Sequence, residues 1–214
     1  LYQYVDHTAL KPYVTFEEIQ KLCMEALKYN MASVCIPSCY VHAVHEAFPK
    51  LRICTVVGFP LGYGNTASKL AETEQAVMDG ADEIDMVINI SDVKNGLFAK
   101  VEEEIREIKE AASERVLKVI IETCELTDEE KVRACLAAKA AGADFVKTST
   151  GFGKGGATAE DVALMKKTIG EGMQVKASTG INTRAICDQM IRAGAVRMGT
   201  SKGIFIVKDE EPKL

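Results

Sequence analysis

The sequence contains no run of basic residues and no apolar stretch long enough to cross a membrane. Lysine and arginine number 26 against 31 aspartates and glutamates, which gives a net charge of −5. This balance argues against a nucleic-acid partner or an anionic membrane surface. A bilayer span takes about 20 apolar residues, and the N-terminal LYQYVDHTALK lacks the regions of a secretory signal. We therefore expect a cytoplasmic protein without nucleic-acid or membrane partners.

Closely paired cysteines and clustered metal ligands are also missing. The seven cysteines, at positions 23, 35, 39, 54, 124, 135 and 187, are odd in number and include no pair separated by two residues. This usage is typical of reduced thiols in a cytosolic protein. His42 and His45 could share a helix face, but no third or fourth ligand lies near them in the sequence. We therefore expect no metal.

No linker or low-complexity tract divides the chain. Its 214 residues, 47% of them hydrophobic, are enough to bury one large core. We therefore expect a single domain across residues 1–214.

Apolar residues at steps of three and four predict helices, most clearly over 16–27, 98–112 and 162–169. Several helix starts also carry a hydroxyl residue followed three positions later by an acid, the pattern of a capping box. These pairs are Thr15 with Glu18, Thr127 with Glu130, and Thr158 with Asp161.

Short, β-branched, nearly continuous apolar runs separate the helices, as expected for parallel strands covered on both faces. The expected strands are 4–8, 33–37, 53–59, 83–89, 117–122, 144–148, 174–178 and 195–199. Most starts recur at about 25 to 30 residues, the length of one βα unit, and Gly-Ala follows a helix at residues 80, 142 and 194. We predict a (β/α)₈ TIM barrel, with a doubly wound open sheet as the alternative.

Polar residues gather toward the carboxyl ends of the expected strands, where a barrel places its active site. They are Asp6, Thr8, Asp85, Asn89, Glu122, Lys147, Ser149, Thr150, Lys176 and Ser178. A purely structural alternative is that Asp85 pairs with Lys147 while Glu122 balances Lys176. However, two lysines on adjacent strands with carboxylates nearby are a costly arrangement for stability alone.

Lys147 is the most informative of these residues, because it follows the buried run Phe145–Val146. A lysine amine is a nucleophile only when it is neutral, and burial beside a second cation favours that form. Lys176 can supply the cation. Lys147 would then attack a carbonyl group to form an iminium, while Asp85 moves protons through a water molecule.

Small residues follow the last strands, at the place where barrels commonly bind phosphate. The segments are Ser178-Thr179-Gly180, Gly199-Thr200-Ser201-Lys202 and Gly151 to Gly156. Their backbone N–H groups could approach an oxyanion. Alternatively, the glycines only form tight βα turns.

The chain resembles the class I deoxyribose-phosphate aldolases in motifs that span almost its whole length. These motifs are DHTALKP (6–12), SVCIP (33–37), TVVGFPLG (55–62), GADEIDMVIN (80–89), KVIIETCELT (118–127), FVKTSTGFGKGGATAEDV (145–162), VKASTGI (175–181) and RMGTSKG (197–203). The resemblance implies a barrel that reversibly cleaves 2-deoxy-D-ribose 5-phosphate into acetaldehyde and D-glyceraldehyde 3-phosphate in deoxynucleoside catabolism. It also implies that no cofactor is used. We further expect a homo-oligomer, either a dimer or a tetramer.

The resemblance also implies roles for individual residues. The Schiff-base lysine falls on Lys147, the second lysine on Lys176 and the proton-relay aspartate on Asp85. The residues expected to bind substrate are Asp6, Thr8, Cys35, Thr150, Gly151, Ser178, Thr179, Gly180, Gly199 and Ser201.

The chain departs from the family pattern at two positions. Many relatives have glycine where this chain has Thr179, so a side chain stands where backbone approaches phosphate. Many also have an asparagine in the segment that here reads Val34-Cys35-Ile36-Pro37. Two alternative functions are considered. The Thr179 change leaves open a lysine aldolase for another phosphorylated sugar. The other is a catalytically silent barrel that binds a sugar phosphate, and the presence of both lysines and Asp85 argues against it.

Overall fold

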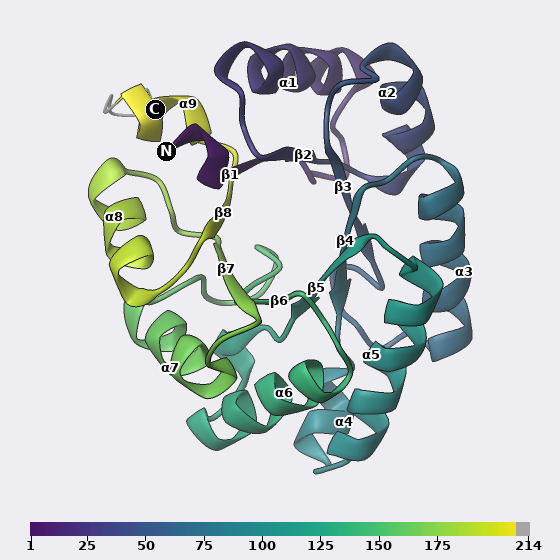
Figure 1. Cartoon of the computed structure of the whole chain (residues 1–214), viewed down its shortest axis with the longest axis vertical. Helices are drawn as coiled ribbons and strands as arrows, with labels where there is room; N and C mark the ends of the chain where they lie inside the picture. Colours follow the sequence, from purple (N-terminus) through teal and green to yellow (C-terminus); the bar gives the residue numbers. More distant parts are fainter. Residues whose placement is uncertain (209–214) are drawn as a thin grey trace.

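The computed structural model describes residues 1–208, which form a closed ring of eight parallel strands surrounded by helices (Figure 1). The strands are β1 (Val5–Thr8), β2 (Ser33–Cys35), β3 (Ile53–Val57), β4 (Glu83–Val87), β5 (Val116–Ile120), β6 (Phe145–Lys147), β7 (Gln174–Ser178) and β8 (Arg197–Thr200). The helices are α1 (Phe16–Tyr29), α2 (Val41–Ala47), α3 (Thr66–Met78), α4 (Ile90–Lys94), α5 (Phe98–Ala112), α6 (Asp128–Ala140), α7 (Ala159–Ile169), α8 (Arg184–Ala193) and α9 (Gly203–Lys208). Short 3₁₀ turns are η1 (Tyr2–Tyr4), η2 (Ser38–Tyr40) and η3 (Thr123–Glu125).

The ring closes because β1 pairs with β2 on one side and with β8 on the other. An open sheet would leave two of its strands at free edges, so the open-sheet alternative is wrong and the (β/α)₈ barrel is confirmed. Several strands end earlier than the apolar runs suggested: the run 83–89 ends as a strand at Val87, and the run 117–122 at Ile120. The remaining residues of these runs turn into the βα loops.

Helix starts follow the expected capping chemistry at two of three places. The boxes at Thr15 and Thr127 are complete, with the hydroxyl and the acid each bonded to backbone. At Thr158 only half of the box forms. The hydroxyl accepts from the Asp161 N–H at 3.0 Å, but the Asp161 carboxylate binds Lys131 Nζ at 2.6 Å. The reciprocal acid expected there is therefore wrong.

The repeated Gly-Ala-Asp segments join helices to strands. Gly80 and Gly142 have φ values of 99° and 80°, in the left-handed region that glycine adopts without strain after a helix. Two residues later, Asp82 accepts from the Ile53 N–H at 2.9 Å and Asp144 from the Leu117 N–H at 2.8 Å. Each aspartate therefore ties the start of its own strand to the start of the preceding strand.

The apolar core packs the strands against the helices, while the interior of the ring is charged. In β4, for example, Ile84 and Met86 belong to the hydrophobic core, whereas the alternating Glu83 and Asp85 are equally buried but ionisable. Branched apolar side chains usually fill the interior of such barrels, so the charged interior of this ring differs from the usual pattern.

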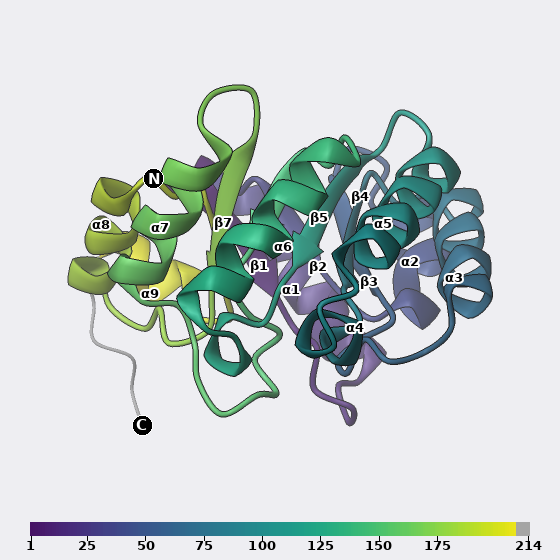
Figure 2. The same cartoon turned by 90° about the horizontal axis from the view of Figure 1, so that it is seen from below.

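Seen from the side, the β1–α1 loop (purple) and the β6–α7 loop (green) lie at the same end of the ring (Figure 2). Within residues 1–208 no helix is long and apolar enough to cross a membrane.

Candidate active site

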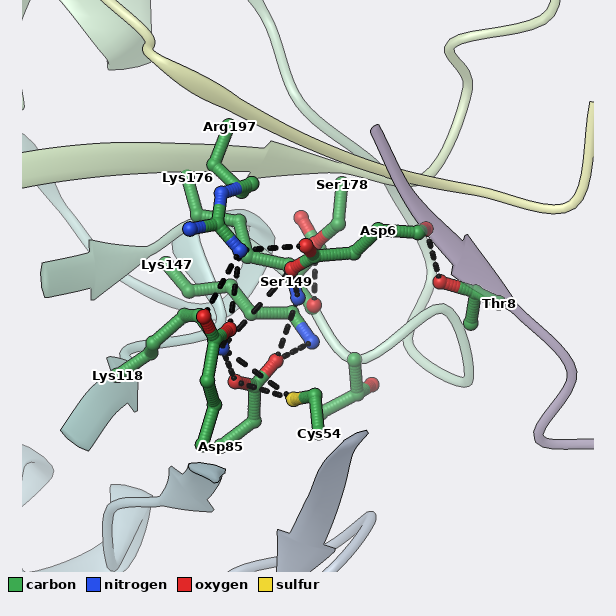
Figure 3. Close-up of polar contacts among 12 residues, drawn as sticks. Asp6, Thr8, Cys54, Asp85, Lys118, Lys147, Ser149, Lys176, Ser178 and Arg197 are labelled. Carbon is green, nitrogen blue, oxygen red and sulfur yellow. Dashed lines mark hydrogen bonds and ion pairs between the residues drawn. The ribbon is translucent and has the colours of Figure 1, made fainter. Parts of the chain in front are cut away.

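Strand register brings the predicted catalytic side chains together inside the ring. Lys147 on β6 lies directly beside Lys176 on β7, and Asp85 on β4 lies beside Lys118 on β5. Because side chains on a strand alternate between its two faces, these neighbours point the same way. Figure 3 shows their polar ends meeting at one place.

Asp85 is the centre of this cluster and has no exposed surface. Its Oδ1 accepts from Lys118 Nζ at 2.7 Å and from the Cys54 thiol at 3.1 Å. Its Oδ2 accepts from Lys147 Nζ at 2.8 Å and from Lys176 Nζ at 2.7 Å. One buried carboxylate therefore contacts three lysines, two of which share a single oxygen.

Charge pairing outweighs burial in this cluster. Burial alone would raise the pKa of the Asp85 carboxyl group, but the neighbouring lysines, Lys118 above all, hold that pKa well below its ordinary value. Burial likewise opposes the charged forms of Lys118 and Lys176, yet the neighbouring carboxylates raise the pKa of both above the ordinary lysine value. At neutral pH Asp85, Lys118 and Lys176 are therefore ionised.

Asp6 joins the same cluster from β1. Its carboxylate binds Lys176 Nζ at 2.6 Å and Arg197 Nη1 at 2.6 Å, and it accepts from the Ser33 hydroxyl at 2.7 Å. Arg197 also binds Glu83 at 2.9 Å. Asp6 is wholly buried and does not line the cavity at the carboxyl end of the barrel. Its predicted contact with substrate stays a prediction, while its contacts here orient Lys176.

Among the described residues, the buried part of the cluster contains one more basic group than acidic groups. Four buried basic side chains share three carboxylates: Lys118, Lys147, Lys176 and Arg197 face Asp6, Glu83 and Asp85. The exposed Arg52 also reaches Glu83, at 3.8 Å. Lys118, Lys176 and Arg197 each contact at least two carboxylates, whereas within residues 1–208 Lys147 contacts only that of Asp85. Lys147 is therefore the basic group held least firmly by opposite charge.

Two thiols lie against the cluster. Cys35 and Cys54 are direct neighbours on β2 and β3. The hydrogen bond with Cys54 lowers the pKa of the Cys35 thiol, although burial opposes that shift. These two thiols and Asp85 have ligand atoms within 4.8 Å of one another, the spacing of a metal site. However, the three lysines on Asp85 make this position unfavourable for a cation.

The predicted phosphate-binding residues surround a cavity of about 540 Å³ at the carboxyl end of the barrel. Its lining includes Thr8, Gly199 of β8 and residues from the turns after β6, β7 and β8, namely Thr150, Gly151, Thr179, Gly180 and Ser201. Ser178 is buried away from this lining, and its hydroxyl donates to the Ser149 carbonyl at 2.7 Å. Ser178 therefore joins the β6 and β7 turns rather than facing the cavity.

Thr179 has an unusual backbone conformation. Its φ is 71°, a region that β-branched residues seldom occupy. Its hydroxyl lies 3.1 Å from the point where a Cβ on Gly151 would stand. The Thr179 side chain thus occupies the space between two of the turns predicted to bind phosphate.

Several important residues were missed or misassigned from the sequence. Glu122 does not balance Lys176: its carboxylate accepts from the Thr150 N–H at 3.2 Å, so that expectation is wrong. Asn89 caps α4 by accepting from the Ser91 N–H at 3.1 Å. The missed members of the cluster are Lys118, Arg197, Glu83 and Cys54. Lys118 carried the same signal as Lys147, a lysine inside an apolar strand.

The fold and the lysine-rich site define an enzyme barrel suited to carbonyl chemistry. A family model described as DeoC/LacD family aldolase matches residues 1–208, and the chain belongs to that family.

Individual relatives agree with this assignment. A deoxyribose-phosphate aldolase of Clostridium botulinum strain Alaska E43 is 55% identical over 210 residues, which cover 98% of this chain and 95% of the relative. The solved structure called "QR15, an Aldolase" superposes with a TM-score of 0.93 at 40% identity, covering 97% of this chain and 94% of that one. A tetrameric deoxyribose phosphate aldolase from Aeropyrum pernix superposes with a TM-score of 0.91 at 30% identity, covering 97% and 89%.

Proposed function

We propose that this chain is a class I aldolase that reversibly cleaves 2-deoxy-D-ribose 5-phosphate into acetaldehyde and D-glyceraldehyde 3-phosphate, with Lys147 forming the Schiff base. The surplus positive charge of the buried cluster carries the proposal. If the Lys147 amine is uncharged, three cations balance three carboxylates, and the neutral amine is the nucleophile that the reaction needs. The deoxyribose-phosphate aldolase relatives support the choice of substrate.

Lys147 would act through a covalent intermediate. Its nitrogen lone pair attacks the C1 carbonyl carbon, the carbonyl oxygen takes up protons and leaves as water, and an iminium remains. The C2–C3 bond then breaks, its electron pair moves toward the positive nitrogen, and the C3 hydroxyl loses its proton to become the aldehyde of glyceraldehyde 3-phosphate. Protonation of the resulting enamine at C2 and addition of water release acetaldehyde and restore the amine.

Lys176 and Asp85 would support these proton movements. Lys176 stays charged between Asp6 and Asp85, so it keeps a positive charge beside Lys147 and disfavours a second one there. The low pKa of Asp85 means that its carboxylate holds a proton only transiently. We infer that a proton relayed by Asp85 comes from a neighbouring ammonium group and returns to one.

The turns around the main cavity would hold the phosphate group. Gly151, Gly180 and Gly199 lack side chains that would block the approach of their backbone N–H groups, and Ser201 adds a hydroxyl donor. Thr8 lines the same cavity. A phosphate bound by these turns would lie at the mouth of the barrel.

We also propose the context in which the chain works. All seven cysteines are free thiols, which supports a cytoplasmic location. The tetrameric Aeropyrum pernix relative supports a homo-oligomer. The closed ring formed within residues 1–208 supports a single barrel domain.

Borohydride trapping tests the proposal. Reduction in the presence of deoxyribose 5-phosphate should fix a secondary amine on Lys147, because it captures the iminium, and peptide mass mapping would locate the adduct. Lys69 offers a matched control, because it is equally buried but pairs with Glu104 outside the ring. An adduct confined to another lysine, or full activity in Lys147→Ala, would refute the assignment.

A further inference from the structure

Glu122 has a strained backbone at the end of β5. Its φ and ψ are 53° and 67°, the left-handed conformation that residues with a Cβ rarely adopt. Its neighbours are fixed, because the Ile121 N–H donates to the Lys147 carbonyl at 3.0 Å and the Thr123 N–H to the Thr148 carbonyl at 2.8 Å. Glycine would take this conformation without strain. A glutamate here therefore points to a task for its side chain.

The Glu122 carboxylate is buried against the β6–α7 loop. It is 4% exposed, and its two oxygens accept from the Thr150 N–H at 3.2 and 3.4 Å. Its Oε2 also accepts from the Thr150 hydroxyl. Within residues 1–208 no basic nitrogen lies within 4.0 Å of this carboxylate. Its hydrogen bonds are thus directed mainly at one residue of the loop.

These contacts decide what the Thr150 hydroxyl can still bind. A hydroxyl group offers one donor and two acceptor lone pairs. The Thr150 donor goes to Glu122, and one lone pair accepts from the Phe152 N–H at 3.1 Å. One lone pair remains, and Thr150 lines the main cavity beside Gly151. Toward a ligand, Thr150 can therefore only accept a hydrogen bond.

We propose that Glu122 is a positioning residue that sets the direction of the Thr150 hydroxyl and so selects acceptor aldehydes with a hydroxyl group next to the phosphate-bearing carbon. Because Thr150 adjoins Gly151, a phosphate held at that turn brings this hydroxyl of the sugar within reach of Thr150. A substrate hydroxyl can donate to the remaining lone pair, whereas a hydrogen, an ether or a carbonyl at that carbon cannot. This inference rests on the proposed aldolase function and adds a specificity to it.

The experiment compares two acceptors in the direction of synthesis with saturating acetaldehyde: D-glyceraldehyde 3-phosphate and 3-oxopropyl phosphate, which lacks the hydroxyl. The unmodified protein should show about tenfold higher kcat/KM for the hydroxylated acceptor, the value of one hydrogen bond. In Glu122→Gln an NH₂ group replaces one of the two oxygens that face Thr150, so the preference should fall below about threefold. Glu125→Gln, at the end of the same turn and paired with Lys154 at the surface, should keep the full preference.

A second variant makes the outcome decisive. Thr150→Val removes the hydroxyl at nearly constant volume and should abolish the preference, and adding Glu122→Gln to it should then change the preference no further. An equal loss for both acceptors in Glu122→Gln would show a merely structural role and overturn the proposal. If Glu122→Gln does not fold, an undiminished preference in Thr150→Val overturns it. Absence of turnover of either acceptor by the unmodified protein would instead contradict the proposed aldolase function.

Discussion

Replacing Asp85 with asparagine should destabilise the protein strongly, because Asp85 holds three lysines at once. The variant would leave four basic groups facing two carboxylates. An asparagine side chain also places an NH₂ group against either Lys118 or the pair Lys147 and Lys176, whichever way the amide is turned. Removing one partner from a buried ion pair costs about 3–5 kcal/mol. At about 2–4 °C per kcal/mol for a chain of this size, Tm should fall by about 6–20 °C.

Thermal and urea unfolding, monitored by circular dichroism, would measure this loss of stability. Asp188→Asn is the matched control, since Asp188 pairs with Arg184 on the surface, where both side chains are more than a third exposed, and it should cost only about 0–1 kcal/mol. The deficit of Asp85→Asn should shrink between pH 7 and pH 9, because the unpaired ammonium groups can then lose protons.

A second substitution tests whether the loss comes from charge. Lys118→Met replaces a straight side chain with an apolar one of similar length, so Asp85→Asn combined with Lys118→Met should be more stable than Asp85→Asn alone. A loss below about 1 kcal/mol in Asp85→Asn, or no recovery in the double variant, would refute the idea that the buried charges depend on one another.

Four further outcomes are expected. Thr179→Gly should change KM for deoxyribose 5-phosphate and leave the kinetics of unphosphorylated 2-deoxyribose nearly unchanged, since Thr179 lies remote from the bond that breaks; an equal change with both sugars would remove this turn from the phosphate site. Lys176→Met should lower kcat for both sugars, because it removes the cation beside Lys147, and an unchanged kcat would contradict that role. EDTA should leave activity intact, and a loss reversed by zinc would favour a metal-dependent reaction instead. The pKa values of Asp6 and Asp85 are lowered in the folded state; the unfolded chain therefore binds more protons below about pH 4, and urea midpoints should fall as the pH drops through that range.

The fold was predictable from the sequence because local and global signals agreed. Apolar runs at intervals of one βα unit, with glycine at the helix ends, indicated eight strands, and all eight formed. Strand ends were less predictable, because the run 83–89 stays apolar past Val87, where the chain already leaves the sheet. Apolarity reports burial, and the first residues of a βα loop can be as buried as the strand.

The candidate site was only partly predictable. Lys147, Lys176 and Asp85 were singled out and do meet, but their partners depend on register and on ring closure. Arg197 binds Asp6 from 191 residues away, a contact that no local pattern reveals. Glu122 was paired with the wrong residue because its side chain direction depends on its left-handed backbone. Sequence reasoning thus identified charged residues more reliably than it identified their contacts.

The buried charges also help to fix the register of the strands in the barrel. In β5, Leu117 and Val119 flank Lys118, and a slip of one residue would put the ammonium group among the helices and an apolar side chain beside Asp85. Strands that are apolar on both faces offer few cues for choosing between alternative alignments. If a lysine has carboxylate partners in just one of these alignments, that alignment is favoured and the ambiguity is removed. The residues that we propose for catalysis would thereby also specify the register in which the strands pair when the ring assembles.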